Sequence, residues 1–310
     1  MPQPVFLMRV ALAGLTCAIL VPSSAAAQSR GVYPLGMSAT NSGVTGEAGF
    51  TYGNQLLFYS RDASKDGSGS TVATGNNAVL MDMNSFVWVS KKQILGGARY
   101  SATVTLPVAK NELTSDLNGP ISGGGGFADS YYLPLILGWN KDRAAFRLLY
   151  GFLAPTGRFD PNGTENVGSG YWTSTISSGQ TVYLTADRRF SFSAFEMYEF
   201  HTTQRGTGIR PGDTFNLDYS LMRTFRVPGK TWPLQVGIVG YEQRQMTARS
   251  GPSVPPTAAT ERYAVNAAGF GSNVTFPDLK LNVGLRFFKE FANRSTFQGF
   301  SLQLSGAIGF

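Results

Sequence analysis

The last eleven residues of the chain alternate between apolar and small polar side chains. In Phe300–Phe310, one set of alternate positions carries large apolar residues, among them Leu304 and Ile308, and the other set carries residues such as Ser305. A repeat of two residues is that of a β-strand with one apolar and one polar face. A strand of about ten residues with hydrocarbon on one face and water on the other suits a membrane barrel. The alternation therefore predicts that the chain crosses a membrane with strands.

Residues 1–27 are expected to be a signal peptide. Arg9 supplies a positive charge, and an apolar stretch of 12 residues follows from Val10 to Val21. A helix needs about 20 apolar residues to span a bilayer, so this stretch is too short. Ala25–Ala27 offers small residues for cleavage. The alternative, a membrane anchor left in place, would need a longer apolar run.

Composition excludes several classes of site. The single cysteine, Cys17, lies within the predicted signal peptide, so the mature chain would have no disulfide, no thiolate metal site and no cysteine nucleophile. Of the 26 basic residues Arg9 lies in the same peptide, which leaves 25 against 19 acidic residues, a formal charge of +6. These basic residues are scattered, which favours modest ion selectivity or contact with lipopolysaccharide over nucleic-acid binding. No cofactor is expected.

The chain from residue 46 to 310 shows twelve alternating segments, which predict an all-β fold, a transmembrane antiparallel up-and-down β-barrel. In hydrocarbon every backbone polar group must be paired, so the last strand is expected to pair with the first. A barrel of this size lies between ~8 strands, which side chains fill, and ~16, which leave an aqueous channel. We therefore expect a narrow or partly plugged pore. The predicted strands span residues 46–60, 78–90, 94–108, 127–139, 143–156, 168–185, 190–203, 212–226, 232–247, 262–275, 279–290 and 297–310.

The connections between these strands alternate in length. Long connections rich in Gly, Ser, Asn and Pro are expected at residues 61–77, 109–126, 157–167 and 248–261, with short turns between them. Long outer loops and short periplasmic turns are typical of a barrel with both termini in the periplasm. Residues 28–45 precede the first strand and show no periodicity. They are expected to be either a periplasmic tail or a small plug in the lumen.

Polar residues within the alternating strands are candidates for the pore wall. A Lys or Arg at mid-depth on the lipid face costs roughly 2–4 kcal/mol, so such residues are predicted to face the lumen. Phe86 and Trp88 are expected on or near the inner face, either as an apolar path for solutes or as packing of a narrow barrel. The candidate lumen and selectivity residues are Arg99, Arg147, Asp218, Lys280, Asn282 and Arg286.

Residues that could carry chemistry are few, and no catalytic or metal-binding residues are expected. The only histidine, His201, is expected to be a surface residue at the outer end of its strand. Glu196 and Glu199 are three positions apart, so they should point to opposite faces of a strand. The loop Asp160–Asn166 has oxygen ligands that could hold calcium, but Asn162-Gly163 is also a plain turn signal, which we favour.

Several motifs together resemble a known family. They are Gly126-Phe127-Ala128-Asp129, Thr156-Gly157-Arg158-Phe159-Asp160, Gly206–Asp213 and Val236–Tyr241. This pattern is similar to that of the SphA-like outer-membrane transporter family of phenol meta-pathway degradation, over about residues 120–310. The family's usual Gly-Asp pair stands here as Ala128-Asp129. The resemblance implies an outer-membrane channel that takes up aromatic or other hydrophobic compounds. The terminal Phe310 also resembles the signal by which outer-membrane barrels engage the barrel-assembly machinery.

Three functional hypotheses remain at this point. The first is a channel of the bacterial outer membrane for passive uptake of small hydrophobic or aromatic compounds, in contact with outer-membrane lipids and lipopolysaccharide. The second is a barrel enzyme that hydrolyses or modifies lipids, with His201 and a neighbouring Thr202 or Thr203. The third is a structural barrel without transport, whose lumen would be filled by side chains.

Overall fold

The computed structural model describes residues 30–115, 119–226, 228–256 and 261–310, so the predicted signal peptide lies outside the described residues. No helix within this part of the chain has the length and apolar character of a membrane span. A single short 3-10 helix, η1 (Pro277–Leu279), lies among the described strands. These strands are β1 (Gly49–Lys65), β2 (Thr71–Ile94), β3 (Ala98–Ser115), β4 (Gly119–Phe127), β5 (Ser130–Asn140), β6 (Ala144–Ala154), β7 (Thr173–Tyr183), β8 (Phe190–His201), β9 (Thr214–Arg226), β10 (Pro233–Gln245), β11 (Ala264–Phe276), β12 (Leu281–Glu290) and β13 (Thr296–Gly309).

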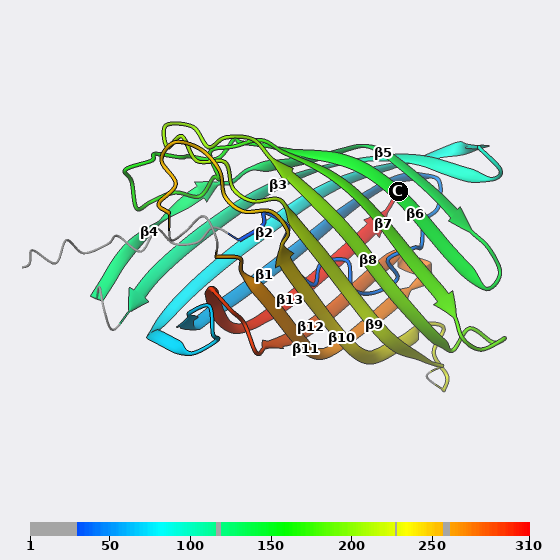
Figure 1. Cartoon of the computed structure of the whole chain (residues 1–310). Coiled ribbons are helices and arrows are strands. Elements are labelled where there is room, and N and C mark those ends of the chain that lie inside the picture. Colours follow the sequence, from blue (N-terminus) through cyan, green and yellow to red (C-terminus); the bar gives the residue numbers. More distant parts are fainter. Residues whose placement is uncertain (1–29, 116–118, 227, 257–260) are drawn as a thin grey trace, which may run out of the picture.

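The strands form one closed antiparallel barrel (Figure 1). β1 pairs with β13 from Thr51–Gly309 to Lys65–Thr296, which confirms the predicted closure of first strand on last. β3 pairs with β5 along one half and with β4 along the other, so β4 and β5 share one position in the wall. The barrel therefore has twelve strand positions, as the sequence predicts.

The outward face of the barrel is largely apolar. In β8, Phe190, Phe192 and Phe200 are exposed, while Ser191 and Glu199 on the alternate positions are buried inside. Pairing each strand with both neighbours satisfies the backbone in hydrocarbon, and the apolar belt supplies the lipid contact. The protein is accordingly an integral β-barrel of the bacterial outer membrane.

Two of the predicted long loops are mainly strand. β1 and β2 continue to residues 65 and 71, and β3 and β4 continue to residues 115 and 119, so residues 61–77 and 109–126 were wrongly expected to be loops. Figure 1 shows these strands reaching beyond the rest of the barrel at its left-hand end. Strand pairing holds these hairpins together outside the membrane, where no lipid imposes a strict alternation of apolar and polar residues.

Phe86 and Trp88 lie on the outer face, which corrects the expectation that they line the inner face. Phe86 is 52% exposed and pairs with the ring of Tyr52, and Trp88 stacks edge-on against Tyr100. Val87 and Val89, the residues between and after them, face the lumen instead. Because this part of β2 is apolar on both faces, alternation alone does not identify the lipid side.

A bulge in β5 changes the face that its side chains present to the lumen. The register with β6 shifts between Tyr132 and Leu135, around Pro134, which has no N–H for the ladder. Tyr131 and Leu133 face the lumen before the bulge, and Ile136 faces it after the bulge. The bulge therefore gives this strand three large lumen-facing side chains where simple alternation would turn the third toward lipid.

Candidate functional site in the barrel lumen

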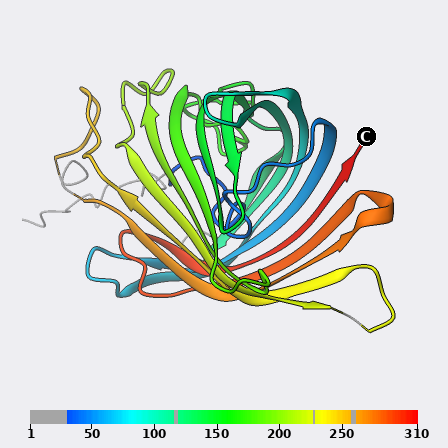
Figure 2. The ribbon, with the colours of Figure 1, turned by 90° about the vertical axis from the view of Figure 1, so that its right-hand side faces the viewer.

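Residues 30–45, called here the inner segment, lie inside the barrel and run along its lumen (Figure 2). Arg30 forms an ion pair at 2.9 Å with Glu290, at the end of β12 that faces the long loops. The Thr45 amide donates to Asn140 Oδ1 at 3.1 Å, at the end of β5 that faces the short turns. The inner segment thus connects the two ends of the barrel, and Arg30 lies at the end opposite to Phe310, whose amide donates to the Phe50 carbonyl.

Two buried carboxylates of the wall hold the backbone of the inner segment. Glu199 accepts the amides of Val32 and Tyr33, each at 2.9 Å. Asp218 accepts the Gly36 amide at 2.9 Å, the Ser38 amide at 3.0 Å and the Tyr33 hydroxyl at 2.6 Å. Hydrogen bonds to an ionised acceptor contribute about 1.5–3 kcal/mol each, so these two side chains account for much of the attachment.

A third carboxylate, Glu290, holds the outer end of the segment. Besides Arg30, it accepts the hydroxyls of Tyr59 at 2.9 Å and Tyr241 at 3.1 Å. Two N–H groups of the Arg30 guanidinium donate to the two Glu290 oxygens, at 2.9 and 3.2 Å, so the buried carboxylate directly compensates the positive charge. Arg30 therefore stays charged inside the lumen.

Three arginines hold the other half of the inner segment. Arg147 Nε donates to the Ser42 carbonyl at 2.6 Å, Arg286 Nη2 to Thr40 Oγ1 at 3.0 Å, and Arg99 Nη1 to the Gly46 carbonyl at 3.4 Å. All three were predicted from the sequence as lumen residues. Arg99 and Arg147 place positive charge near the short-turn end of the lumen, and Arg286 places it near the middle of β12.

Glycines allow the segment to lie directly against the wall. A Cβ at Gly43 would overlap the Ala145 carbonyl oxygen and the Thr181 amide nitrogen, and a Cβ at Gly179 would overlap the Ser42 carbonyl. The Gly43 amide donates to Thr181 Oγ1 at 3.1 Å. The close approach of backbone to backbone requires glycine at both positions.

The inner segment divides the lumen into a filled side and a hollow side. On the filled side, Leu35 and Ala39 pack with buried side chains of β9–β12, including Tyr241 and Phe288, whose rings lie 4.9 Å apart. Gln303 Nε2 donates to the Leu35 carbonyl at 2.7 Å, which closes this side further. This side of the lumen is therefore closed by packed side chains.

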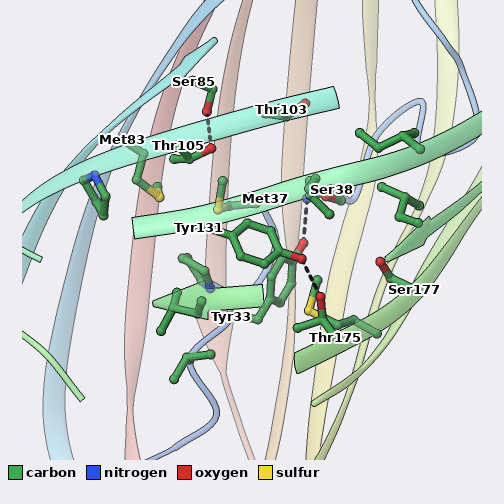
Figure 3. Close-up of a pocket in the computed structure, with 18 of the residues that line it drawn as sticks. Tyr33, Met37, Ser38, Met83, Ser85, Thr103, Thr105, Tyr131, Thr175 and Ser177 are labelled. Atoms are coloured by element: carbon green, nitrogen blue, oxygen red, sulfur yellow. Dashed lines mark hydrogen bonds between the residues drawn. The ribbon is translucent and has the colours of Figure 1, made fainter. Parts of the chain in front are cut away.

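A cavity of about 440 Å³ occupies the hollow side, between the inner segment and strands β2, β3, β5, β6, β7 and β8 (Figure 3). Its volume is within the range of small-molecule sites. Met37, Met81, Met83 and Met197 contribute polarizable thioethers to a predominantly apolar wall. Its polar groups are mostly hydroxyls, and some of these hydrogen-bond to one another, as Tyr131 does with Thr175 at 2.8 Å. The cavity extends from Val167 and Ser169 at the long-loop end to Thr45 and Gly46 at the short-turn end.

Asp129 organises the loop over the outer mouth of this cavity. It lies between β4 and β5 and accepts the Gly157 amide at 2.9 Å, the Ser169 amide at 2.7 Å and the Ser169 hydroxyl at 2.6 Å. The loop 155–172 is thereby folded back over the barrel, with Val167 and Ser169 at the cavity. The motifs around Asp129 and Gly157 thus shape the entrance.

The remaining predicted lumen residues lie at the short-turn end. Asn282 is in β12 and donates to Thr275 Oγ1 at 2.8 Å. Lys280 lies outside β12, in the turn after η1, where it has a φ of 48° and an exposed side chain. Of the six predicted residues, Arg147, Asp218 and Arg286 contact the inner segment and Arg99 contacts Gly46 directly after it, whereas the structure does not bring Lys280 or Asn282 to the segment.

His201 is buried, which corrects the expectation of a surface histidine. It is 4% exposed, its Nδ1 lies 2.8 Å from Thr173 Oγ1, and its Nε2 lies 3.5 Å from Glu199 Oε2. Its position two residues after Glu199 in β8 puts both on the inner face, whereas Glu196 faces outward as predicted. Thr173 and Glu199 are both fully buried, so no substrate reaches this hydroxyl.

The loop at Asp160–Asn166 is a hydrogen-bonded turn. Asp160 Oδ1 accepts the Asn162 amide at 2.9 Å, and Asn166 Oδ1 accepts the Asp160 amide at 2.7 Å. The side-chain oxygens that could have held calcium thus stabilise the loop itself. No cluster of three or more His, Cys, Asp or Glu side chains suited to a metal is present within the described ranges.

Sequence reasoning missed the residues that place the inner segment. Tyr33, Glu199 and Glu290 have no motif that marks them, because their partners are remote in the chain. A usable signal was present for Glu199, since it shares the inner face of β8 with Ser191 and Ser193. The lumen methionines could not be assigned, because an apolar lumen and an apolar lipid face produce the same residue types.

Comparison with known proteins agrees with this architecture. An outer membrane channel from Pseudomonas putida F1 is 13% identical, with a TM-score of 0.67 over 87% of this chain and 98% of that chain. The β domain of the Bordetella autotransporter BrkA is 12% identical, with a TM-score of 0.50 over 85% of this chain and 100% of that chain. No curated protein matched. Residues 60–305 match the family described as "Putative MetA-pathway of phenol degradation", and the chain belongs to that family.

Proposed function

We propose that the protein is a channel for the passive uptake of small hydrophobic or aromatic compounds across the outer membrane. The cavity beside the inner segment carries this proposal, because it is mainly apolar and has lining residues at both ends of the barrel. A solute could pass along it without displacing the packed residues on the other side of the inner segment. The description of the family, which refers to phenol degradation, agrees with this solute class.

The chemistry of the wall favours aromatic solutes. Thioethers such as those of Met83 and Met197 adapt to irregular shapes and contact aromatic rings favourably, by about 0.3–1.5 kcal/mol. Tyr33 and Tyr131 add ring surface beside them, with Phe195 packed against Tyr33 at a centroid distance of 5.5 Å (Figure 3). The hydroxyls of Ser85, Thr105 and Thr175 would hydrogen-bond to a polar substituent of the solute.

We also propose that the protein acts without chemical catalysis. The arrangement of Thr173, His201 and Glu199 contains the residue types of a nucleophile and its base. In such a group Thr173 would be the nucleophile and His201 its base, but Thr173 is fully buried, so its hydroxyl is inaccessible to a substrate. The Glu199 carboxylate, which would orient His201, accepts the Val32 and Tyr33 amides instead. Its role in this proposal is to hold the inner segment.

The proposed partners follow from the barrel surface. The exposed apolar belt would contact lipid, and polar groups near the long-loop end, such as the Arg244–Glu242 pair at 3.1 Å, would contact lipopolysaccharide. β13 and the exposed Phe310 would be engaged by the barrel-assembly machinery during insertion.

A pair of neighbouring substitutions tests the uptake proposal. Thr103 lines the cavity, whereas Ala102 beside it points outward opposite Trp88. Thr103→Trp should lower the initial uptake rate of radiolabelled toluene by bacteria that produce the protein, by at least several-fold, while Ala102→Trp leaves it unchanged. Equal uptake by both variants and by cells without the protein would contradict the proposal.

A further inference from the structure

Arg147 is a cationic side chain of the cavity that has no acidic partner. Its Nε donates to the Ser42 carbonyl, and among the described residues no carboxylate lies within ion-pair distance of it. Arg30 is paired with Glu290 at 2.9 Å and Arg210 with Asp213 at 2.8 Å, whereas Arg99 and Arg286 form no ion pair with a described residue either but do not line the cavity. A guanidinium that lines an apolar cavity without a counterion is a receptor for an anion.

Two further polar atoms at the same end of the cavity lack partners. The hydroxyl oxygens of Ser177 and Thr45 are buried and have no hydrogen bond within the described part of the chain, and both residues line the cavity. Ser177 pairs with Leu149 across β6 and β7, one inward position along the wall from Arg147. Thr45 and Arg147 both lie over Gly138, where an added Cβ would contact each of them.

The surroundings of this group are apolar. Ile136, Leu149, Phe195 and Met197 form a buried cluster against the cavity, with Tyr131 and Leu133 packed on it. Among the described residues that line the cavity, one is acidic, Asp129 at the opposite end, and the Gly157 and Ser169 amides and the Ser169 hydroxyl occupy its oxygens. An anionic group would therefore meet attraction near Arg147, while an attached ring would contact hydrocarbon.

From this arrangement we propose that the channel's solutes are small aromatic carboxylates, with the carboxylate on the Arg147 guanidinium and the ring against Leu149, Phe195 and Met197. A carboxylate matches the planar fork of a guanidinium and can accept two parallel N–H bonds. The hydroxyls of Ser177 and Thr45 would donate to the same oxygens. The inference rests on the proposed uptake function and identifies aromatic acids as a preferred class among its aromatic solutes.

Benzoate and benzamide provide a matched pair of probes, because they differ in charge and hardly in shape. Equilibrium dialysis would measure binding of each radiolabelled compound to the folded, detergent-solubilised mature chain. We expect benzoate to bind about tenfold more tightly than benzamide, as expected when an ionic hydrogen-bonded contact contributes about 1.4 kcal/mol. In Arg147→Gln the ratio should fall to about one while benzamide binding is retained, and Arg147→Lys should keep part of the preference.

The exposed Arg226 at the end of β9 provides the control, since Arg226→Gln makes the same change of charge away from the cavity. Heat-modifiable migration on a gel shows whether each variant is folded, and the wild-type ratio is informative even if Arg147→Gln fails to fold. Equal binding of both probes to the wild-type chain would overturn the carboxylate inference and leave the uptake function standing. Binding of neither probe would contradict both.

Discussion

Asp218 shows how one side chain sets the position of a whole segment. It lies in the middle of β9, fully buried, and accepts two amides and one hydroxyl of the inner segment. Three hydrogen bonds compensate the cost of burying the carboxylate. Without the carboxylate, the two amides and the hydroxyl that donate to it would be buried without an acceptor. The attachment of the inner segment therefore depends on few residues.

Replacing Asp218 tests this dependence. Asp218→Ala removes the acceptor for Gly36, Ser38 and Tyr33, so the inner segment should leave its position for a larger fraction of the time. At about 1.5–3 kcal/mol for an ionic hydrogen bond, we expect transitions from the steady conductance to a larger one to become about tenfold or more as frequent in single-channel recordings. Glu242→Ala on the outer face is the control, and equal opening in the two variants would disprove the role of Asp218.

Gly43 provides a steric test at the same scale. Gly43→Val would force a side chain into the Ala145 carbonyl and the Thr181 amide. Overpacking of this kind costs about 1–3 kcal/mol, so we expect it to displace the part of the inner segment around residue 43 from the wall. Gly46 has nothing within 4 Å of its Cβ position, so Gly46→Val is a matched control three residues away. Limited proteolysis of the folded protein should cut the segment faster in Gly43→Val only; identical digestion patterns would contradict the close contact.

The strands as elements obey the two-residue alternation except where a specific residue interrupts it. β9 could be assigned to its faces from sequence, because polar and apolar residues alternate from Thr214 to Leu221. In β8 the alternation holds at both ends of the strand, but the inner Phe195 and Met197 and the outer Glu196 break it in the middle. β5 could not be assigned, because the bulge at Pro134 reverses the face of Ile136. The faces of β2 could not be assigned from the sequence either, because both are apolar: one carries Phe86 and Trp88, and the other carries Val87 and Val89.

β8 carries a charge toward lipid near the middle of the strand. Glu196 is the seventh of the twelve residues of β8, and its side chain points outward and accepts Ser178 Oγ at 2.8 Å and Gln180 Nε2 at 2.9 Å. A charge at mid-depth costs more than one near the rim, and acidic residues cost less than basic ones. The neighbouring hydroxyl and amide reduce this cost without removing the charge.

Glu196→Gln should therefore stabilise the barrel, because it removes the charge and keeps an acceptor oxygen. We expect the free energy of unfolding, from urea titration in lipid vesicles, to rise by about 1 kcal/mol. Glu242→Gln, three residues from the outer end of β10, should change it by less than about 0.5 kcal/mol. A loss of stability in Glu196→Gln would mean that the carboxylate has a partner on that face rather than lipid.

At the scale of the whole molecule, the barrel was predictable from the sequence and the contents of its lumen were only partly so. The pairing of β1 with β13 follows from the chemistry of hydrocarbon, which forbids a free sheet edge. The path of residues 30–45 could not be predicted in this way, because their backbone amides bind Glu199 and Asp218, which lie more than 150 residues away in the chain. Such contacts leave no periodicity in the segment that makes them.

The lumen arginines show which properties of a side chain could be predicted from the sequence and which could not. Arg147 and Arg286 could be assigned to the lumen because their neighbours along the strand are large apolar residues, as Phe146 and Leu148 are for Arg147. Their contacts with Ser42 and Thr40 could not be foreseen, and neither could the absence of an acidic partner for Arg147. Alternation fixes the face of a side chain, whereas its partners depend on what fills the barrel.

In the proposed function, aromatic solutes pass through the cavity beside the inner segment. Single-channel recording of the refolded mature chain in a planar bilayer, with and without phenol, toluene or a long-chain fatty acid, tests it most directly. We expect a small steady conductance that phenol or toluene interrupts. Thr103→Trp should reduce this conductance, because the tryptophan side chain would occupy the same cavity as the solute. A folded, heat-modifiable barrel that stays silent, or a current that no aromatic solute changes, would contradict the proposed function.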